Sequence, residues 1–305
     1  MTRYKILYAT MSIACALLFA TDCKQPPAPA ADTERLVTLS GGVTEIVFAL
    51  GAGDRVVGVD TSSVYPAAAR KLPQLGYHRK ISAEGILSLN PTLVLASEDS
   101  GPPEALKQIR AAGVEVRTVP EKASVDAAEE RVSTIAAVLD RKAKGDELLA
   151  RLKREIQEAR AGIDALSEPK PRAVFIYIRG GKVLLAAGKY SPGATMLELS
   201  GAENAMNSFY GYKPLAAESL VAAKPDVLVL LKHGVASVGG IDEVLKIPGV
   251  ALTPAGKQNR FVIMDDLLFS GFTHRLGLAI RELSRGIHPE LSGQTATADT
   301  THDAR

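Results

Sequence analysis

Tryptophan is absent from the sequence, and only 5% of the 305 residues are aromatic. The two cysteines, Cys15 and Cys23, both lie near the N-terminus. The chain that follows them therefore has no thiol with which to form a disulfide, a thiolate metal site or a nucleophile. Because aromatic side chains are so scarce, each tyrosine is a candidate for a specific role.

Excess charge and long hydrophobic runs are also missing. The 36 basic and 34 acidic residues give a formal net charge of +2, which provides no bulk attraction to nucleic acid or to an acidic membrane surface. Beyond residue 20, no segment is long and apolar enough to span a bilayer. The composition, with 46% hydrophobic and 23% charged residues, is typical of a globular protein.

The first 30 residues, 1–30, have the features of an export leader. A basic start precedes the apolar run 6–20, which is short for a membrane span. Two processing routes remain open. The small residues of 28–30 suit ordinary cleavage, whereas Cys23 suits a lipid anchor, although Asp22 departs from the usual lipoprotein pattern. Both routes predict that the folded part is exported.

Two stretches 134 residues apart repeat each other. Residues 82–95 read SAEGILSLNPTLVL and residues 216–229 read AAESLVAAKPDVLV, with Ala, Glu and Pro at matching positions. A Gly-Tyr pair, ending in Tyr77 or in Tyr212, precedes each copy. Two copies are too few for a solenoid, so we expect two lobes built alike, with a ligand cleft between them.

Hydrophobic patterning predicts alternating strands and helices on both sides of a helical middle. This α/β pattern covers residues 34–122 and resumes over 168–290. Residues 124–167 are predicted to be helical, with apolar residues three or four apart from 148 to 166. We expect a long backbone helix here, joining two Rossmann-like lobes with parallel sheets as a rigid strut. Residues 291–305 are predicted to be a disordered tail.

Tyr77 is the candidate ligand residue of the first Gly-Tyr pair. The segment Gly76-Tyr77-His78-Arg79 is a polar loop, from which a phenol can point into a cleft. An ionised phenol is a hard ligand for ferric iron, and the cation of Arg79 would favour the ionised form. On composition alone, a half-buried packing role is the commoner one for such a tyrosine. The five histidines show no metal-site spacing, and a core or solvated role is expected for His78.

Glu84 and Glu218 begin the two repeated helices, where the helix dipole favours a carboxylate. This structural role is enough to explain a glutamate at one helix start. It explains less well why both copies of the repeat have a glutamate at the same position. Exposed on two lobes, the pair could dock on matching basic sites of a two-subunit partner. The sequence shows no phosphate-binding glycine loop, hydrolase elbow, zinc motif or nucleic-acid module.

Five segments carry a resemblance to a known family: residues 35–46 (RLVTLSGGVTEI), 57–62 (VGVDTS), 65–66 (YP), 72–79 (LPQLGYHR) and 87–103 (LSLNPTLVLASEDSGPP). The first has a pattern general to one class of binding proteins, whereas GYHR at 76–79 and SEDSGPP at 97–103 are more specific. Over residues 34–290 the chain resembles the periplasmic haem-binding proteins of bacterial haem ABC importers. These belong to the helical-backbone class that includes cobalamin and siderophore carriers.

The resemblance implies roles for several residues. Tyr77 would be the axial ligand of the haem iron, with Arg79 as its hydrogen-bonding or charge partner. Glu84 and Glu218 match the glutamates by which this class docks on arginines of a membrane permease. The loop 188–193 lacks the histidine that some relatives contribute, so five-coordinate haem through Tyr77 is expected. Candidate contacts from the second lobe are Tyr190, Tyr212, His274, Lys189 and Arg179.

The function implied is capture and delivery, not catalysis. A monomeric periplasmic protein would hold haem between its lobes and pass it to the permease dimer of an ABC importer at the inner membrane, for haem and iron uptake. A cobalamin or ferric-siderophore carrier is an alternative, and such a ligand would need no phenolate at Tyr77. An exported hydrolase is a further alternative, but it would need a nucleophile–base pair that the sequence does not show.

Overall fold

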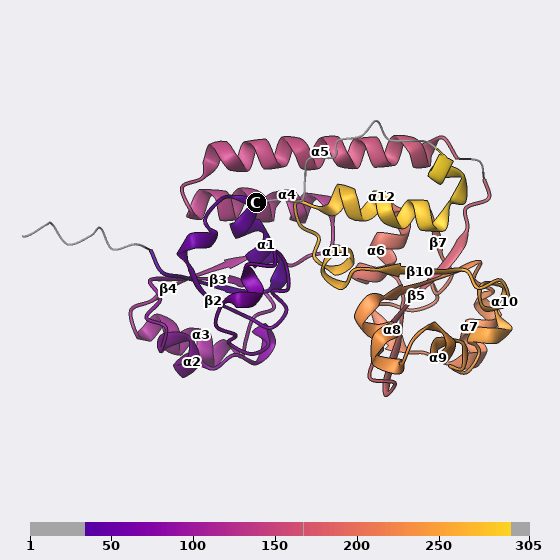
Figure 1. Ribbon diagram of the computed structural model, residues 1–305, viewed down its shortest axis with the longest axis horizontal. Helices are drawn as coiled ribbons and strands as arrows, with labels where there is room; N and C mark the ends of the chain where they lie inside the picture. The colour runs from indigo at the N-terminus through magenta and orange to yellow at the C-terminus, as the bar shows by residue number, and fades with distance from the viewer. Residues whose placement is uncertain (1–33, 167, 294–305) are drawn as a thin grey trace, which may run out of the picture. The chain divides into compact units, whose positions relative to one another are not determined.

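The computed structural model (Figure 1) describes residues 34–166 and 168–293, which belong to one compact unit. The predicted leader with its Cys23 lies outside the described residues, and so do residues 294–305 of the predicted tail. Disorder was predicted from residue 291 onward, but residues 291–293 complete a 3₁₀ helix that begins at Pro289, and Leu291 is buried. None of the described helices is long and apolar enough to cross a bilayer.

The N-terminal lobe is built on a parallel sheet. Its elements are β1 (Leu36–Leu39), α1 (Gly41–Ala49), η1 (Gly53–Arg55), β2 (Val56–Val59), η2 (Ala69–Lys71), η3 (His78–Lys80), α2 (Ala83–Leu87), β3 (Leu93–Ser97), α3 (Pro103–Ala111) and β4 (Glu115–Val119). Within residues 34–166 the strands pair in the order β2-β1-β3-β4. The central strands β1 and β3 are buried along their whole length, because α1 packs on one face of the sheet and α2 and α3 pack on the other. Burial on both faces explains why these strands are continuous apolar runs.

The C-terminal lobe is built on a mixed sheet. Its elements are β5 (Arg172–Arg179), β6 (Val183–Ala187), α6 (Pro192–Leu199), β7 (Glu203–Asn204), β8 (Tyr212–Pro214), α7 (Ala217–Ala223), β9 (Val227–Leu231), α8 (Lys232–Val238), α9 (Ile241–Leu245), η4 (Val250–Leu252), α10 (Pro254–Lys257), β10 (Phe261–Met264), α11 (Asp266–Ser270), α12 (Leu276–Ile287) and η5 (Pro289–Gly293). Within residues 168–293 the order is β10-β9-β5-β6-β8, and β7 pairs with β5. The predicted α/β fold is confirmed, but this sheet is not parallel throughout, because β6 and β8 run antiparallel to their neighbours.

The internal repeat corresponds to equivalent elements in the two sheets. Helix α2 and strand β3 begin at residues 83 and 93, and α7 and β9 begin at residues 217 and 227, so both pairs keep the 134-residue offset. In the first sheet β3 lies between β1 and β4, and in the second β9 lies between β5 and β10, all parallel. The two lobes therefore share a common core, as the repeat predicts.

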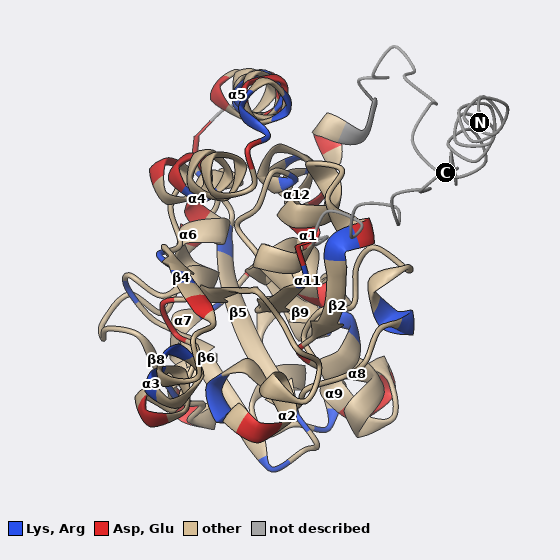
Figure 2. Cartoon of the chain, turned by 90° about the vertical axis from the view of Figure 1, so that its left-hand side faces the viewer, with Lys and Arg blue, Asp and Glu red and all other residues tan. Residues whose placement is uncertain are grey.

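Long helices connect the two lobes. Helix α4 (Val125–Val138) packs against α1, and α12 packs against β10. Helix α5 (Lys142–Asp164) packs along both α4 and α12, as Figure 1 shows. Its side chains Leu148, Leu152 and Ile156 are buried, as the predicted apolar stripe requires. Charged residues of both signs cover its outer side (Figure 2). The predicted backbone helix is thus present and bridges the lobes.

Candidate ligand-binding site

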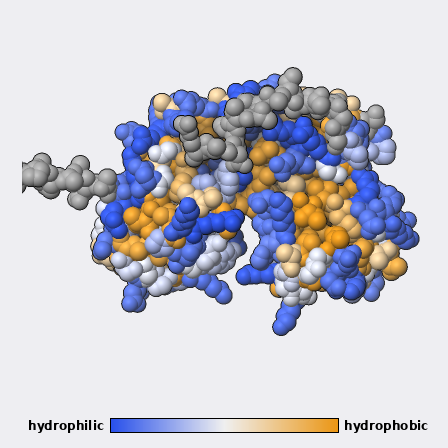
Figure 3. Space-filling model, in the orientation of Figure 1, coloured by the Kyte–Doolittle hydropathy of each residue, from blue (hydrophilic) through white to orange (hydrophobic). Residues whose placement is uncertain are grey.

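A cleft of about 440 Å³ is lined by residues of both lobes, and its volume lies within the range of about 300–1,000 Å³ that small-molecule sites occupy. Figure 3 shows the surface hollowed between the lobes. The N-terminal lobe lines the cleft with residues that follow the carboxyl ends of its strands: Ser40 after β1, Tyr77 after β2, Asp99 after β3 and Glu121 after β4. Open parallel sheets bind their ligands at this edge.

Tyr77 lies in this cleft, on the loop between β2 and α2. Gly76 precedes it with a φ of 83°, a conformation that favours glycine. The loop is held on both sides, because Thr61 N–H donates to the carbonyl of Gly76 and Gly101 N–H donates to the carbonyl of His78, each at 2.9 Å. Tyr77 is 42% exposed, and none of the described residues forms a hydrogen bond with its hydroxyl. The phenol is therefore available to a ligand.

A buried hydrogen-bond network supports the Tyr77 loop. The carboxylate of Asp60 accepts hydrogen bonds from the hydroxyls of Ser62 at 2.6 Å and Ser63 at 2.7 Å, and its Oδ2 lies 3.1 Å from Nδ1 of His78. Burial raises the pKa of Asp60, but the hydrogen bonds from His78 and the two serines outweigh burial and hold this pKa below its usual value. The His78 ring packs edge-on against the Tyr77 ring, with centroids 4.4 Å apart. His78 is thus a core histidine that supports Tyr77.

Arg79, the predicted partner of Tyr77, also lies at the cleft. Its guanidinium forms an ion pair with the carboxylate of Asp99, on the loop that follows β3. Both side chains are about half exposed, and both line the cleft together with Tyr77. The segments around residues 76–79 and 97–103, far apart in sequence, are therefore brought together at one edge of the sheet.

The C-terminal lobe lines the cleft with the face of its sheet. Phe175 and Tyr177 of β5 point to this face, because side chains two residues apart on a strand share a face. Leu185 of β6 and Tyr212 of β8 continue the wall. Gly193 N–H donates to the Tyr212 hydroxyl at 3.1 Å. Burial raises the pKa of Tyr212, so its phenol stays protonated. The role of Tyr177 in the cleft was not predicted. The sequence signal for it was the two-residue spacing from Phe175, which puts both side chains on one face of the strand.

Arg131 of α4 closes the floor of the cleft, and nothing in the sequence indicated this role. Its side chain is 1% exposed, and its Nη1 donates to the carbonyls of Gly271 at 2.7 Å and Phe272 at 3.1 Å. Its Nε donates to the carbonyl of Pro120 at 2.6 Å. Burial lowers the pKa of Arg131, and the nearby carboxylate of Glu121 opposes that effect. Arg131 therefore ties α4 to the loop between α11 and α12.

A second tie joins Glu45 of α1 to the same loop. The Nε of Arg275 donates to Glu45 Oε1 at 2.8 Å, and its Nη2 pairs with Oε2. The hydroxyl of Thr273 also donates to this carboxylate. Between these residues, Nδ1 of His274 lies 3.6 Å from Glu45 Oε1, and burial lowers the pKa of His274. His274 is 9% exposed and does not line the cleft, in contrast to its predicted role as a haem contact.

The other candidate contacts of the second lobe also lie outside the cleft lining. Tyr190 is 86% exposed and stacks on Tyr210, with ring centroids 5.6 Å apart. Lys189 and Arg179 are exposed, and neither lines the cleft. Of the five candidates, only Tyr212 is part of the cleft wall.

Glu84 and Glu218 occupy equivalent positions on the two lobes. Each lies in the first turn of its helix, α2 or α7, and each is exposed. At these helix starts a carboxylate complements the partial positive charge of the unpaired N–H groups. The structure therefore presents both glutamates at the surface, as the repeat predicts.

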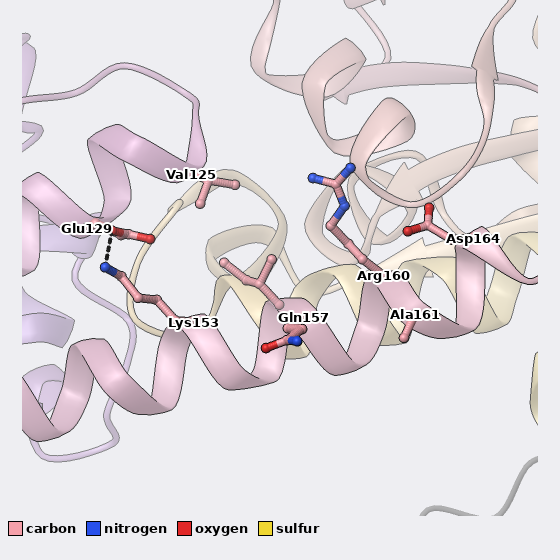
Figure 4. Close-up of a pocket in the computed structure, with 8 residues that line it drawn as sticks. Val125, Glu129, Lys153, Gln157, Arg160, Ala161 and Asp164 are labelled. Atoms are coloured by element: carbon pink, nitrogen blue, oxygen red, sulfur yellow. Dashed lines mark ion pairs between the residues drawn. The ribbon is translucent and has the colours of Figure 1, made fainter.

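A second hollow, of about 420 Å³, lies along α5 (Figure 4). Glu129 of α4 and Lys153 of α5 form an ion pair of 3.0 Å at its edge. None of the predicted site residues lines this hollow, so the cleft between the lobes is the better candidate site. In the part of the chain that the structure describes, no group of three or more His, Cys, Asp or Glu side chains is placed to hold a metal ion.

Two similar lobes with a ligand-sized cleft between them define a two-lobed solute-binding protein. The family model described as "Periplasmic binding protein" matches residues 36–268, and the chain belongs to this family.

Two of the three similar proteins described next have a ligand in their names. The chain is similar to the solved structure of the periplasmic heme-binding protein RhuT from Roseiflexus sp. RS-1, at 44% identity and a TM-score of 0.82, over 85% of this chain and 99% of that one. It is also similar to the uncharacterized ABC transporter substrate-binding lipoprotein YvrC of Bacillus subtilis (strain 168), at 29% identity over 85% of this chain and 81% of that protein. The vitamin B12-binding protein of Vibrio cholerae serotype O1 is 25% identical over 74% of this chain and 79% of that protein.

Proposed function

We propose that this protein captures haem in the cleft between its lobes and delivers it to the permease of an ABC importer, working in the periplasm as an exported or lipid-anchored protein. The observation that carries the proposal is the position of Tyr77. Its phenol lies in the cleft on a braced loop, 42% exposed and without a hydrogen bond from the described residues. An anionic phenolate is a suitable axial ligand for ferric haem.

The other groups of the cleft fit this cargo. Arg79, next to Tyr77, can favour the phenolate or meet a haem carboxylate once Asp99 releases it. Tyr177 and Leu185, which are partly exposed and backed by the buried Phe175, offer the apolar surface that a porphyrin ring needs. Tyr212 is a poor iron ligand, because its hydroxyl accepts a hydrogen bond and its pKa is raised by burial. We therefore propose Tyr77 as the one axial ligand.

The exposed carboxylates of Glu84 and Glu218 are proposed to dock on the two subunits of the permease. They lie at equivalent places of two similar lobes, so each can meet the same basic site on one of two identical subunits. Paired charges at an interface guide association and fix the orientation of the partners.

Catalysis does not fit the polar groups of the cleft. Ser62, His78 and Asp60 lie together, but the Ser62 hydroxyl donates directly to Asp60 at 2.6 Å and lies 3.5 Å from the same His78 nitrogen that faces Asp60. In a catalytic triad the histidine uses different nitrogens for the nucleophile and for the carboxylate. This cluster is therefore structural, and we propose that the protein is not an enzyme.

Titration with ferric haem, followed by absorption spectroscopy, tests the proposal. Wild-type protein should bind haem saturably with a high-spin tyrosinate spectrum. Tyr77→Ala should weaken binding at least about 100-fold, which corresponds to about 2.7 kcal/mol. Tyr65→Ala is a matched control, because Tyr65 is 43% exposed but does not line the cleft, and it should bind as wild type. Absence of saturable binding by the wild type would contradict the haem assignment.

Cobalamin is the second candidate ligand, because vitamin B12-binding proteins are among the relatives. Cobalamin does not need a phenolate from the protein, so its binding should survive Tyr77→Ala. The same titration carried out with cobalamin separates the two candidates: saturation by cobalamin and not by haem would replace the proposed cargo.

A further inference from the structure

Two tyrosines outside the cleft are the most exposed large hydrophobic side chains in the described part of the chain. Tyr190 is 86% exposed and Tyr210 is 70% exposed. Single hydrophobic residues scattered on a surface need no explanation. These two, however, are in contact, with their rings nearly parallel at 10° and their centroids 5.6 Å apart. This is an offset stack, which presents a flat aromatic surface to solvent.

The backbone builds this tyrosine pair by joining two loops. Lys189 N–H donates to the carbonyl of Phe209 at 2.8 Å, and Gly211 N–H donates to the carbonyl of Lys189 at 2.9 Å. Gly188 lies so close to Phe209 that a Cβ at this position would overlap its ring. Tyr190 itself has a φ of 57°, a left-handed conformation that is unfavourable for tyrosine. Strain of this kind persists only where the surroundings enforce it, so the backbone that carries Tyr190 is held in place before any ligand arrives.

The tyrosine pair adjoins the cleft wall of the C-terminal lobe. Pro192, two residues after Tyr190, lines the cleft, and so does Tyr212, two residues after Tyr210. Both loops therefore run directly from the exposed pair into the wall. A ligand that stacks on the Tyr190–Tyr210 pair would therefore lie next to the wall of the cleft.

The charge around the pair indicates the kind of ligand. Lys189 lies next to Tyr190, and Lys213 Nζ lies over the Phe209 ring, 5.3 Å from its centroid. Residues 188–191 and 209–213 contain these two lysines and no acidic residue. The permease is not the expected partner of this pair. To bind Glu84 and Glu218 it would present basic groups, and Lys189 and Lys213 would repel such groups. A flat aromatic anion is favoured by both the rings and the lysines.

We propose that the Tyr190–Tyr210 pair is a capture subsite, on which a planar, anionic aromatic macrocycle lies before it enters the cleft. The proposal rests on the proposed function, since haem is such a macrocycle. The subsite acts on the rate of capture and leaves the final ligation by Tyr77 unchanged. One aromatic stack stabilises a bound ring by about 0.5–1.5 kcal/mol, so its loss should slow association by about two- to twelvefold.

Stopped-flow absorption with ferric haem tests the capture subsite. The variants are Tyr190→Ala combined with Tyr210→Ala, and Leu252→Ala as a control, because Leu252 is 63% exposed on the same lobe and outside both tyrosine loops. The double variant should associate about two- to twelvefold more slowly, with the same final spectrum as wild type. An unchanged rate, or an equal loss in the Leu252→Ala protein, would overturn the proposal.

A metal-free porphyrin separates this proposal from the proposed function. Without iron the porphyrin has no axial bond to Tyr77, so its fluorescence on binding reports ring contacts alone. In a Tyr77→Ala background, the change Tyr190→Ala with Tyr210→Ala should slow porphyrin association, followed by stopped-flow fluorescence, about two- to twelvefold. Equal association rates with and without the pair would overturn the capture subsite even if haem binds the cleft. Failure of haem to bind the wild type would contradict the proposed function. The porphyrin experiment would even then show whether the Tyr190–Tyr210 pair acts as a capture subsite.

Discussion

The two lobes share a core but line the cleft in different ways. The parallel strands β1, β3 and β4 of the first lobe correspond to β5, β9 and β10 of the second. The first lobe places loops at the strand ends in the cleft, and these carry Tyr77, Arg79 and Asp99. The second lobe adds the antiparallel strands β6 and β8, so a sheet face forms its wall. The N-terminal lobe thus supplies Tyr77 and the charged groups of the cleft, and the C-terminal lobe supplies most of its aromatic surface.

The largest expected effect concerns the aromatic wall of the C-terminal lobe. Phe175 is 1% exposed and stacks on Phe269 with centroids 4.6 Å apart. Phe175→Ala should lower the free energy of unfolding by about 3–5 kcal/mol, because it leaves a cavity in a packed core. Urea unfolding measures this change, with Leu252→Ala as an exposed control that should change stability by less than about 0.5 kcal/mol. A loss below about 1 kcal/mol for Phe175→Ala would show that the wall is not packed as described.

Removing the tie between the lobes should have the next largest effect. Arg131→Met deletes the donors to the carbonyls of Gly271 and Phe272 and leaves Glu121 without its nearest cation. We expect a loss of about 3 kcal/mol in unfolding free energy, because the buried carbonyls lose their partners. Arg117→Met, which removes an exposed arginine paired with Glu115, is the control and should cost less than about 1 kcal/mol. Similar losses in both proteins would contradict the role of Arg131.

The buried network behind Tyr77 should give a smaller, pH-dependent effect. The pKa of Asp60 lies below its usual value of 3.8 in the folded protein, so its carboxylate stabilises the fold above that pH. As the pH falls below 3.8 toward the folded pKa, this contribution is lost. Asp60→Asn should therefore cost about 1–3 kcal/mol at pH 7, and the difference from wild type should shrink in acid. Urea unfolding between pH 7 and pH 3 measures it, and a difference that does not change with pH would be inconsistent with this role.

The smallest effect on stability is expected for the two surface glutamates. Glu84→Ala and Glu218→Ala should each change the unfolding free energy by less than about 1 kcal/mol, because both side chains are exposed at helix starts. Each should nevertheless weaken docking on the permease by a similar factor, since the lobes present them equivalently. Binding to permease in nanodiscs measures this, with Glu104→Ala of α3 as an exposed first-turn control. A loss confined to one glutamate would show that the lobes do not dock alike.

Much of the shared core could be predicted from the sequence, because it depends on local patterns. The repeat located α2 with β3 and α7 with β9, and the apolar stripe located α5. The polar Gly-Tyr loop placed Tyr77 among the candidate ligands, and the structure puts it in the cleft.

The parts that differ between the lobes depend on long-range contacts that no local pattern reports. Strand β8 has three exposed residues, including Pro214, so it has no apolar alternation to recognise. Gly180 and Gly181, both with positive φ, turn the chain between β5 and β6 into a hairpin, which the prediction of parallel sheets did not anticipate. Arg131 binds backbone carbonyls 140 and 141 residues away, which no spacing rule anticipates. The position of His274 beside Glu45 could not be predicted either, because Glu45 belongs to the other lobe and lies far away in the sequence.

The most direct test of the division between the lobes compares their two cleft tyrosines. Tyr77→Phe and Tyr212→Phe each remove one hydroxyl and keep the ring, and ferric haem is added to both proteins while absorption is recorded. We predict that the tyrosinate spectrum disappears in Tyr77→Phe and persists in Tyr212→Phe, whose hydroxyl in the wild type is occupied by Gly193 N–H. A tyrosinate spectrum that persists in Tyr77→Phe and is lost in Tyr212→Phe would contradict the assignment of the iron ligand to the N-terminal lobe.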